Sequence, residues 1–248
     1  MSLHDIALNL RFQRRRSDPA EVWQTVTMTR RVPARQIAII ICDMWDKHWS
    51  RGASERVDAM APRMNEVVKA TRAAGALIIH APSETMDSYR DSPARARALA
   101  APLVPMPEPT PREVPPLPID DSDGGSDTGE ASWYTAWTCQ HPAIEIDEAK
   151  DAISDDGQEV WNLLRERGVA QLLIMGVHTN MCILDRPFGI KAMVQRGVDT
   201  ALVRDLTDAM YNPARPPHVT HDEGTRLVVD YIEKHWCPTI LSADLLAA

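Results

Sequence analysis

A chain of 248 residues with a net charge of −8 is long enough to bury a substantial core, as one large domain or two small ones. Hydrophobic residues make up 44% and charged residues 25%, which excludes a largely disordered chain. Basic residues are scattered, and their one short cluster, at residues 14–16, indicates a solvated surface rather than a nucleic-acid groove. We therefore expect no nucleic-acid partner.

The apolar stretches and the cysteines indicate the compartment. The longest apolar run covers residues 37–42, whereas a membrane span needs about 20 residues, so no membrane partner is expected. The first residues lack the apolar stretch of a secretory signal, so we expect a cytoplasmic location. The cysteines form no CxxC pair and no zinc-ribbon spacing, which predicts reduced thiols; they are Cys42, Cys139, Cys182 and Cys237.

Two kinds of segment alternate after the first 35 residues. Residues 36–42 form an apolar run rich in isoleucine, which is typical of a strand buried on both faces in a parallel sheet. Residues 54–74 have helical periodicity and stop before Gly75, a typical helix end. Residues 76–80 predict a second strand.

The second half of the chain continues this alternation. The predicted elements are a strand at 143–147, a helix at 155–167, a strand at 171–176, a helix at 180–196, a strand at 199–204, a helix at 221–235 and a strand at 239–241. Such alternation with short connections predicts an α/β fold, a three-layer α-β-α sandwich with a mainly parallel sheet. We expect one domain over residues 36–248, with residues 1–35 as an N-terminal arm or an extra hairpin.

Residues 101–142 interrupt the pattern. Eight prolines fall within residues 101–130, and an acidic Asp/Gly run covers residues 120–127. This composition predicts an insertion without regular structure, which forms either a lid or an oligomer arm. The acidic run lacks the spaced glutamate of a calcium loop, so a solvated turn is the better interpretation.

The chemistry is expected at the carboxyl ends of the strands, where parallel sheets bind ligands. Asp43 ends the first strand, and Cys182 begins the helix that follows the strand at 171–176. A thiol at a helix N-terminus is favoured as a thiolate, and free backbone N–H groups there can receive an oxyanion. Taken singly, each has a simpler explanation: Cys182 as a core residue, Asp43 as a cap, and Lys150 as a surface lysine.

Taken together, these blocks resemble the isochorismatase-like cysteine hydrolases, a family that includes nicotinamidases and ureido-group amidohydrolases. The resemblance covers about residues 36–208. Its marks are Asp43 after an apolar strand, Lys150 ahead of a helix, and the glycine–threonine–cysteine block at residues 172–183. It implies hydrolysis of a carbon–nitrogen bond in an amide, imide or ureido group of a small molecule, through a covalent acyl-enzyme on Cys182.

The resemblance also implies a role for each residue. Cys182 is the expected nucleophile, Asp43 the general base and acid, and Lys150 the electrostatic partner. The backbone N–H groups of His178 and Cys182 are expected to form the oxyanion hole, and the peptide bond between Val177 and His178 is expected to be cis. Because a cation lowers a thiol pKa and a carboxylate raises it, the three side chains would form a coupled system.

The sequence departs from nicotinamidases in its metal ligands. Those enzymes bind a metal through an Asp-x-His pair and a further histidine, and residues 80–86 lack the pair. We therefore expect no metal, no cofactor, and a substrate other than nicotinamide. An atypical metal site would have to assemble from Asp46, His48, His80 and Glu84. His48 and His80 are instead expected to line the pocket or to make ordinary hydrogen bonds.

Further candidate substrate contacts lie beside the motifs. Trp45 is expected to form a pocket wall, and Phe188 and His80 are further candidate substrate contacts. Arg186 has two explanations, a bidentate partner for a substrate carboxylate or an ion pair with a neighbour such as Asp205. Because Pro187 cannot donate a backbone hydrogen bond, the helix is expected to kink there.

Two other classes of function fit parts of the sequence. A catalytically silent binding or assembly protein would keep the fold, but here nucleophile, base and lysine are all present. A nucleotide-binding oxidoreductase fits the alternation, but no GxGxxG motif follows the first strand. Since members of the resembled family usually oligomerise, we expect a homo-oligomer that binds a small-molecule substrate.

Overall fold

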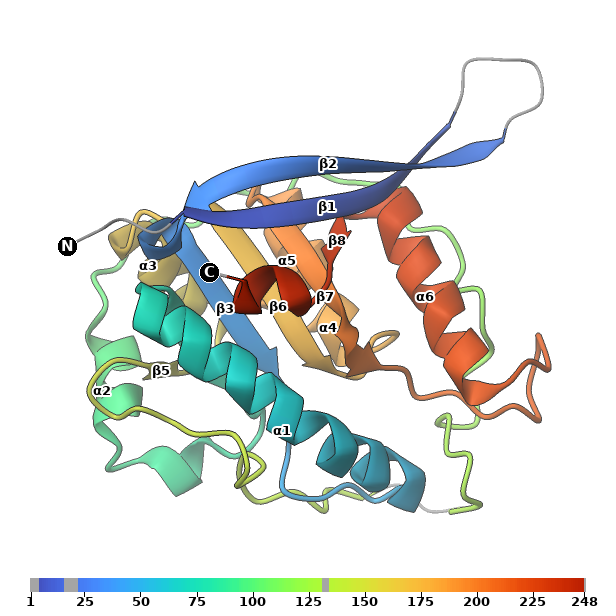
Figure 1. The fold of residues 1–248 in the computed structure, drawn as a ribbon. Helices are drawn as coiled ribbons and strands as arrows, with labels where there is room; N and C mark the ends of the chain where they lie inside the picture. Colours follow the sequence, from blue (N-terminus) through green and yellow to red (C-terminus); the bar gives the residue numbers. More distant parts are fainter. Residues whose placement is uncertain (1–4, 16–21, 131–133, 248) are drawn as a thin grey trace.

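The computed structural model describes residues 5–15, 22–130 and 134–247. Within them, eight strands form one sheet in the order β2-β1-β8-β7-β6-β3-β4-β5 (Figure 1). The strands are β1 (Asp5–Arg15), β2 (Trp23–Pro33), β3 (Ile37–Cys42), β4 (Leu77–Ala81), β5 (Ala152–Ile153), β6 (Gln171–Val177), β7 (Thr200–Asp208) and β8 (Thr239–Ile240). The six strands from β8 to β5 are parallel, and the β1–β2 hairpin joins β8 in antiparallel fashion.

Helices cover both faces of the sheet. They are α1 (Arg51–Ala74), α2 (Pro93–Ala100), α3 (Gly157–Glu166), α4 (Cys182–Asp185), α5 (Ile190–Gln195), α6 (His221–His235) and α7 (Ala243–Leu246), with short 3₁₀ helices at Ala34–Gln36 and Met86–Tyr89. One face packs against α1 and α7, and the other against α2 to α6 (Figure 1). The predicted three-layer α/β fold is therefore confirmed.

The central strand β3 shows why these residues form a doubly covered sheet. All six of its side chains are buried, and successive ones point to opposite faces, as the period of a strand requires. One set joins the core under α1 and consists of Ile37, Ile39 and Ile41. The other joins the core on the far side and consists of Ala38, Ile40 and Cys42.

Two predicted elements were wrong in detail. Residues 143–147 form no strand, because this segment bonds to side chains of α1: Asn65 accepts from the Glu145 amide, and Arg72 donates to the Glu145 carbonyl. The edge strand is instead β5, further along the chain. The helix expected at 180–196 is broken into α4 and α5, which separate at Pro187 as its missing N–H predicts.

The insertion at residues 101–142 forms no helix and no strand in its described part and lies along the far-face helices before it reaches the site. The Thr110 amide donates to the Gln195 carbonyl at the end of α5, and Tyr231 of α6 donates to the Pro115 carbonyl. Beyond this point the segment crosses the carboxyl ends of the strands, where Asn180 donates to Asp121. This path brings the insertion to the carboxyl ends of the strands.

Gly176 of β6 occupies a position that only glycine fits. Its φ is +117°, and an added Cβ would lie 2.0 Å from the Cys42 carbonyl oxygen of β3. We expect Gly176→Ala to lower the free energy of unfolding by about 3 kcal/mol or more, since it adds a backbone clash to an unfavourable φ. Urea denaturation measures this.

The matched control for that change is Gly75→Ala at the end of α1. Gly75 has a φ of +104°, but nothing lies within 4 Å of an added Cβ. Gly75→Ala should therefore lower the free energy of unfolding through backbone strain alone, by about 1–2 kcal/mol. Equal losses in the two variants would show that the close approach of β3 and β6 carries no cost.

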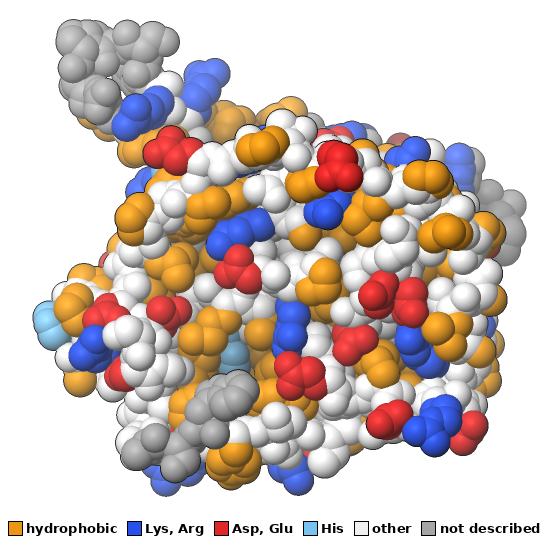
Figure 2. Space-filling view, turned by 180° about the vertical axis from the view of Figure 1, so that it is seen from behind, with side chains coloured by type: hydrophobic (Ala, Val, Ile, Leu, Met, Phe, Trp, Pro, Cys, Tyr) orange, Lys and Arg blue, Asp and Glu red, His pale blue; other side chains and the backbone are white. Residues whose placement is uncertain are grey.

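The surface carries charges of both signs. Figure 2 shows the face opposite to that of Figure 1, where acidic and basic side chains are interspersed rather than gathered by sign. None of the helices in the described residues combines the length and the apolar composition that crossing a membrane requires.

Candidate active site

The site is built around Asp43, which follows β3 at the carboxyl edge of the sheet. It is fully buried and has a φ of +49°, a conformation that Asp adopts more readily than most residues. The sheet order places β4 and β6 on either side of β3, so both neighbours supply partners. The Ser83 amide, after β4, donates to Oδ1 at 2.9 Å, and Nε of Arg186 donates to Oδ2 at 2.9 Å.

Cys182 reaches the same point from the other side. A tight turn follows β6, in which the Met181 and Ile183 amides both donate to the His178 carbonyl, and the peptide bond between Val177 and His178 is cis, as the resemblance implies. Cys182 is the first residue of α4, and its thiol lies close enough to the Asp43 carboxylate for each group to shift the pKa of the other. The two side chains therefore lie near each other at the carboxyl edge of the sheet.

Both groups of this pair have raised pKa values. Burial is the main cause for each; for Cys182 the negative charge of Asp43 adds to it, while Arg186 opposes the shift in both. The expectation that the helix N-terminus favours a thiolate is therefore wrong for the resting site. α4 has only four residues, and burial with a neighbouring carboxylate outweighs its dipole.

Lys150 does not reach the site. Its side chain is 64% exposed and pairs with Asp147 at 3.2 Å, in the turn that precedes β5. The strand begins at Ala152, so Lys150 precedes it and lies away from the carboxyl edge where Asp43 stands. Ser154, not a lysine, follows β5 at that edge. The sequence-based placement of Lys150 beside Cys182 is wrong for this reason.

Arg186 provides the positive charge that Lys150 was expected to provide. It is the residue before Pro187, which disfavours helical backbone, and it accordingly ends α4 in an extended conformation with ψ of 152°. Besides the bond to Asp43, Nη1 lies 3.4 Å from Glu84. The ion-pair explanation therefore holds for Arg186, although the partners are Asp43 and Glu84 rather than Asp205.

A cavity of about 160 Å³ lies beside Cys182. Its lining is mainly aromatic and apolar and consists of Trp45, His48, Trp49, Glu84, Gly124, Trp137, His178, Met181, Cys182, Arg186 and Met210. The location predicted for Trp45 agrees with this lining. Gly124 and Trp137 belong to the insertion, which thus forms part of the cavity wall.

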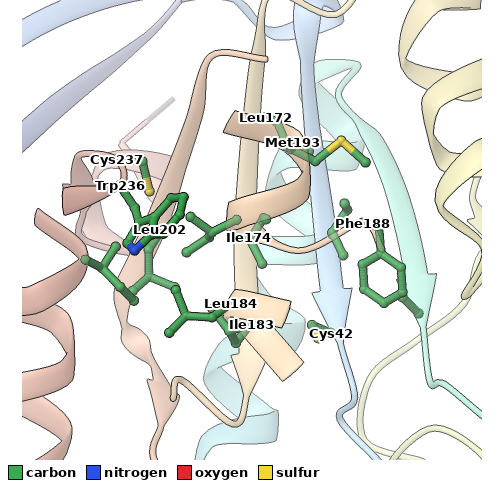
Figure 3. Packing of buried hydrophobic residues seen from close by; sticks show 14 of the residues in the cluster. Cys42, Leu172, Ile174, Ile183, Leu184, Phe188, Met193, Leu202, Trp236 and Cys237 are labelled. Atoms are coloured by element: carbon green, nitrogen blue, oxygen red, sulfur yellow. The ribbon is translucent and has the colours of Figure 1, made fainter. Parts of the chain in front are cut away.

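Two other candidate contacts lie elsewhere. His80 is fully buried outside the cavity, where its ring nitrogens lie 2.8 Å from Gln140 Oε1 and 3.0 Å from Asp151 Oδ2. Phe188 is also fully buried and packs in the core beneath α4 and α5 (Figure 3). Both assignments as substrate contacts are wrong, because each side chain is enclosed by protein.

The four residues considered for an atypical metal site do not come together. Asp46 accepts from the Thr138 amide and hydroxyl, and Nδ1 of His48 accepts from the Ser50 amide. His80 is held in its own buried network, as described above. Among the described residues, no group of three or more His, Cys, Asp or Glu side chains is arranged to hold a metal ion.

Backbone groups suited to an oxyanion lie beside the sulfur. Within the described residues, the Cys182 amide donates to no acceptor. The backbone of His178 interacts with the sulfur and lowers the pKa of the thiol. Both backbone groups thus lie close to Cys182.

The sequence and the fold agree with those of one family. The family model called Isochorismatase domain matches residues 37–219, which is most of the chain. The chain belongs to the isochorismatase family of hydrolases. None of the curated proteins compared with it matches.

Solved structures of this family share the fold at low identity. A cysteine hydrolase from Pseudomonas syringae pv. phaseolicola has a TM-score of 0.56 at 16% identity and covers 87% of this chain and 93% of its own. A putative isochorismatase from Burkholderia xenovorans has a TM-score of 0.52 at 15% identity, with 86% of each chain covered. A putative isochorismatase hydrolase from Oleispira antarctica has a TM-score of 0.51 at 13% identity and covers 86% and 97%.

The part of this isochorismatase-family site that sequence reasoning missed is the aromatic wall. Sequence analysis singled out Trp45 among the tryptophans, and the structure places Trp49 and Trp137 in the cavity with it. A signal was available: Trp133, Tyr134 and Trp137 gather in an insertion otherwise rich in proline, aspartate and glycine. Trp133 lies outside the described residues.

Proposed function

We propose that the protein hydrolyses a carbon–nitrogen bond in an amide, imide or ureido group of a small molecule, with Cys182 as nucleophile, Asp43 as base and acid, and Arg186 as the fixed cation. The observation that carries this proposal is the Cys182–Asp43–Arg186 arrangement beside a mostly apolar cavity. A thiol, a carboxylate near it and a cation bonded to the carboxylate are the parts of an activated nucleophile.

In the first half of the reaction, the Cys182 sulfur attacks the carbonyl carbon. As the S–C bond forms, the thiol proton passes to Asp43, whose pKa is raised by burial and is thereby matched to proton transfer. The carbonyl oxygen becomes an oxyanion, which the amides of His178 and Cys182 stabilise. Asp43 then gives the proton to the nitrogen, the C–N bond breaks, and ammonia or an amine leaves.

In the second half, water attacks the thioester carbon. Asp43 accepts a proton from the water, the C–S bond breaks, and the proton returns to the sulfur. One amide and one water are consumed, one acid and one amine are released, and the enzyme is restored. Because both proton transfers use the same carboxylate, the site needs no second base.

Arg186 keeps Asp43 ionised in this cycle. Without a cation, the burial of Asp43 would favour a neutral carboxyl group that accepts no proton. The ion pair opposes this rise in pKa, and the Ser83 amide supports it. Since the guanidinium is bonded to both Asp43 and Glu84, its position is fixed before the substrate arrives.

Trapping of the acyl-enzyme tests the proposal. Wild-type protein is mixed with an activated ester of a small carboxylic acid, quenched with acid within seconds and analysed by intact mass and peptide mapping. We expect one acyl group on the peptide that contains Cys182, and none in Cys182→Ala. Cys139→Ala, which removes another partly exposed thiol, should acylate like the wild type. Acylation at Cys139 alone, or no acylation, would refute the proposed nucleophile.

A further inference from the structure

A second cavity lies at the amino edge of the sheet, where β6 and β7 begin, and the proposed hydrolysis does not use it. Its volume is about 310 Å³, larger than the cavity of about 160 Å³ beside Cys182. Its lining includes Ala170 and Asp199, which directly precede the two strands. Cys182 follows the opposite end of β6, and because this strand has seven residues, the two cavities are on the order of 20 Å apart.

The charged residues of this second cavity leave it positive. They are Arg30 of β2, Arg165 of α3, Arg196 next to the end of α5, and the carboxylate Asp199. Three positive charges and one negative charge give a net charge of +2, in a chain whose overall net charge is −8. The basic residues are scattered in the sequence, and the fold brings these three together. A concave surface of this charge favours an anion that carries two negative charges.

Asp199 neutralises only one of the three arginines. Its Oδ2 lies 3.0 Å from Nη1 of Arg30. Arg196 uses Nη1 to donate to the Ala192 carbonyl of its own helix at 3.0 Å, and its Nε is buried without a hydrogen-bond partner. No carboxylate among the described residues forms an ion pair with Arg196, so this guanidinium has donors to offer a ligand.

Trp161 holds the third arginine in place. The guanidinium of Arg165 lies 5.5 Å from the centre of the Trp161 ring, a cation–π contact that limits the rotation of an otherwise exposed side chain. In the part of the chain that the structure describes, Arg165 has no acidic partner. Much of the remaining lining is apolar and includes Leu164, Val169 and Val198. The cavity thus combines guanidinium groups for an anion with apolar surface for a group attached to that anion.

We propose that this cavity binds a small organic phosphate, whose phosphate group pairs with Arg165 and Arg196 and whose apolar ester group packs against Trp161 and Val198. A phosphate monoester carries about two negative charges at pH 7.5, which matches the net charge of the lining, whereas a carboxylate carries one. A volume of about 310 Å³ lies within the range of pockets that bind small molecules. The inference is independent of the proposed hydrolysis, because the two sites lie at opposite edges of the sheet.

Four matched compounds test the ligand class by calorimetry with the wild-type protein at pH 7.5 and low salt. Phenyl phosphate has both the dianion and the apolar ring, phenol lacks the charge, benzoate carries one charge, and inorganic phosphate lacks the ring. We expect phenyl phosphate to bind at least about tenfold more tightly than each of the other three, and its affinity to fall as sodium chloride is added. Equal or tighter binding of any of the three would overturn the inference.

Variants then locate the bound phosphate. Arg165→Gln and Arg196→Gln should each weaken the binding of phenyl phosphate by about tenfold, because each removes a charge-assisted hydrogen bond. Arg90→Gln is the matched control, since Arg90 is 74% exposed, pairs with Asp87 and follows β4 at the other edge of the sheet. It should bind phenyl phosphate like the wild type.

Asp199→Asn provides a test in the opposite direction. It removes the one carboxylate of the lining, so phenyl phosphate should bind about threefold more tightly, a gain that a misfolded protein would not show. The inference is wrong if phenyl phosphate does not bind, if both arginine variants bind it like the wild type, or if Asp199→Asn binds it no more tightly. None of these measurements uses hydrolysis, so a failure of the proposed function would leave them unchanged.

Discussion

Replacement of Asp43 by asparagine is expected to lower kcat/KM for amide hydrolysis by about a thousandfold and to make Cys182 easier to alkylate near neutral pH. The loss follows because asparagine accepts no proton from the thiol and returns none to the leaving nitrogen. If Asp43 only held the structure, its replacement would not lower the rate of hydrolysis and raise the rate of alkylation at the same time.

The gain in alkylation follows from the sign of the pKa shifts. Burial and the negative charge of Asp43 both raise the pKa of Cys182, and Arg186 lowers it. Asparagine removes the anion and leaves the cation, so the thiol pKa falls and the thiolate fraction at a given pH rises. The alkylation rate of Cys182 should therefore increase at every pH below the pKa of the wild-type thiol.

Iodoacetamide labelling followed by intact mass from pH 6 to 9 measures this change, together with hydrolysis of the best amide found. Asp185→Asn is the matched control, because Asp185 lies on the same short helix as Cys182, is 56% exposed and pairs with Lys191. Asp185→Asn should change neither the rate of hydrolysis nor the alkylation of Cys182. An unchanged alkylation rate in Asp43→Asn would show that the Asp43 charge does not act on the thiol, and a slower rate would show that Asp43 promotes loss of the thiol proton instead of raising the thiol pKa.

The parts of the fold that sequence predicts well are those set by local pattern. The isoleucine run of β3 has no plausible location except the middle of a covered sheet, and α6 was predicted with the bounds that the structure shows, His221–His235. Its N-cap Thr220 accepts from the Glu223 amide, a local signal that a sequence carries openly. The edge strand β5 has only two residues, too few to give any pattern.

The site was only partly predictable, because the place of Arg186 in it depends on contacts between distant parts of the chain. Asp43 and Cys182 follow strands whose order puts their ends together, and the sequence shows both strands. Arg186 reaches Asp43 across 143 positions of the chain, and Pro187 sets the backbone from which it does so. Lys150 precedes β5 and does not follow it, and the pattern of apolar residues in the sequence does not show on which side of so short a strand it lies.

Replacement of Arg186 is expected to change the alkylation of Cys182 in the direction opposite to Asp43→Asn. It should also abolish most of the hydrolysis. In Arg186→Met, kcat/KM should fall by about a hundredfold or more, because Asp43 loses the cation that keeps it ionised. Alkylation of Cys182 should slow, since the charge that lowers its pKa is gone. Lys150→Met should change neither rate, as Lys150 lies on the surface.

The pH profile separates this electrostatic role from a structural one. Burial raises the pKa of Asp43 and Arg186 opposes that rise, so its removal raises the pKa further. Activity requires ionised Asp43 and increases with pH through that pKa, so the acid limb of kcat/KM should move to higher pH in Arg186→Met. A variant that had merely lost its packing would lose activity without moving the limb.

Arg186→Lys provides the rescue, since it restores a positive charge without the guanidinium fork. We expect it to recover part of the activity and to bring the acid limb back toward the wild-type position, with melting temperatures of all variants recorded to confirm that each is folded. If Lys150→Met instead loses as much activity as Arg186→Met, the catalytic cation is the lysine that the family resemblance implies, and the site must rearrange to bring Lys150 to Asp43. If neither variant loses activity, Asp43 needs no cation, and its burial alone sets the pKa at which the reaction runs.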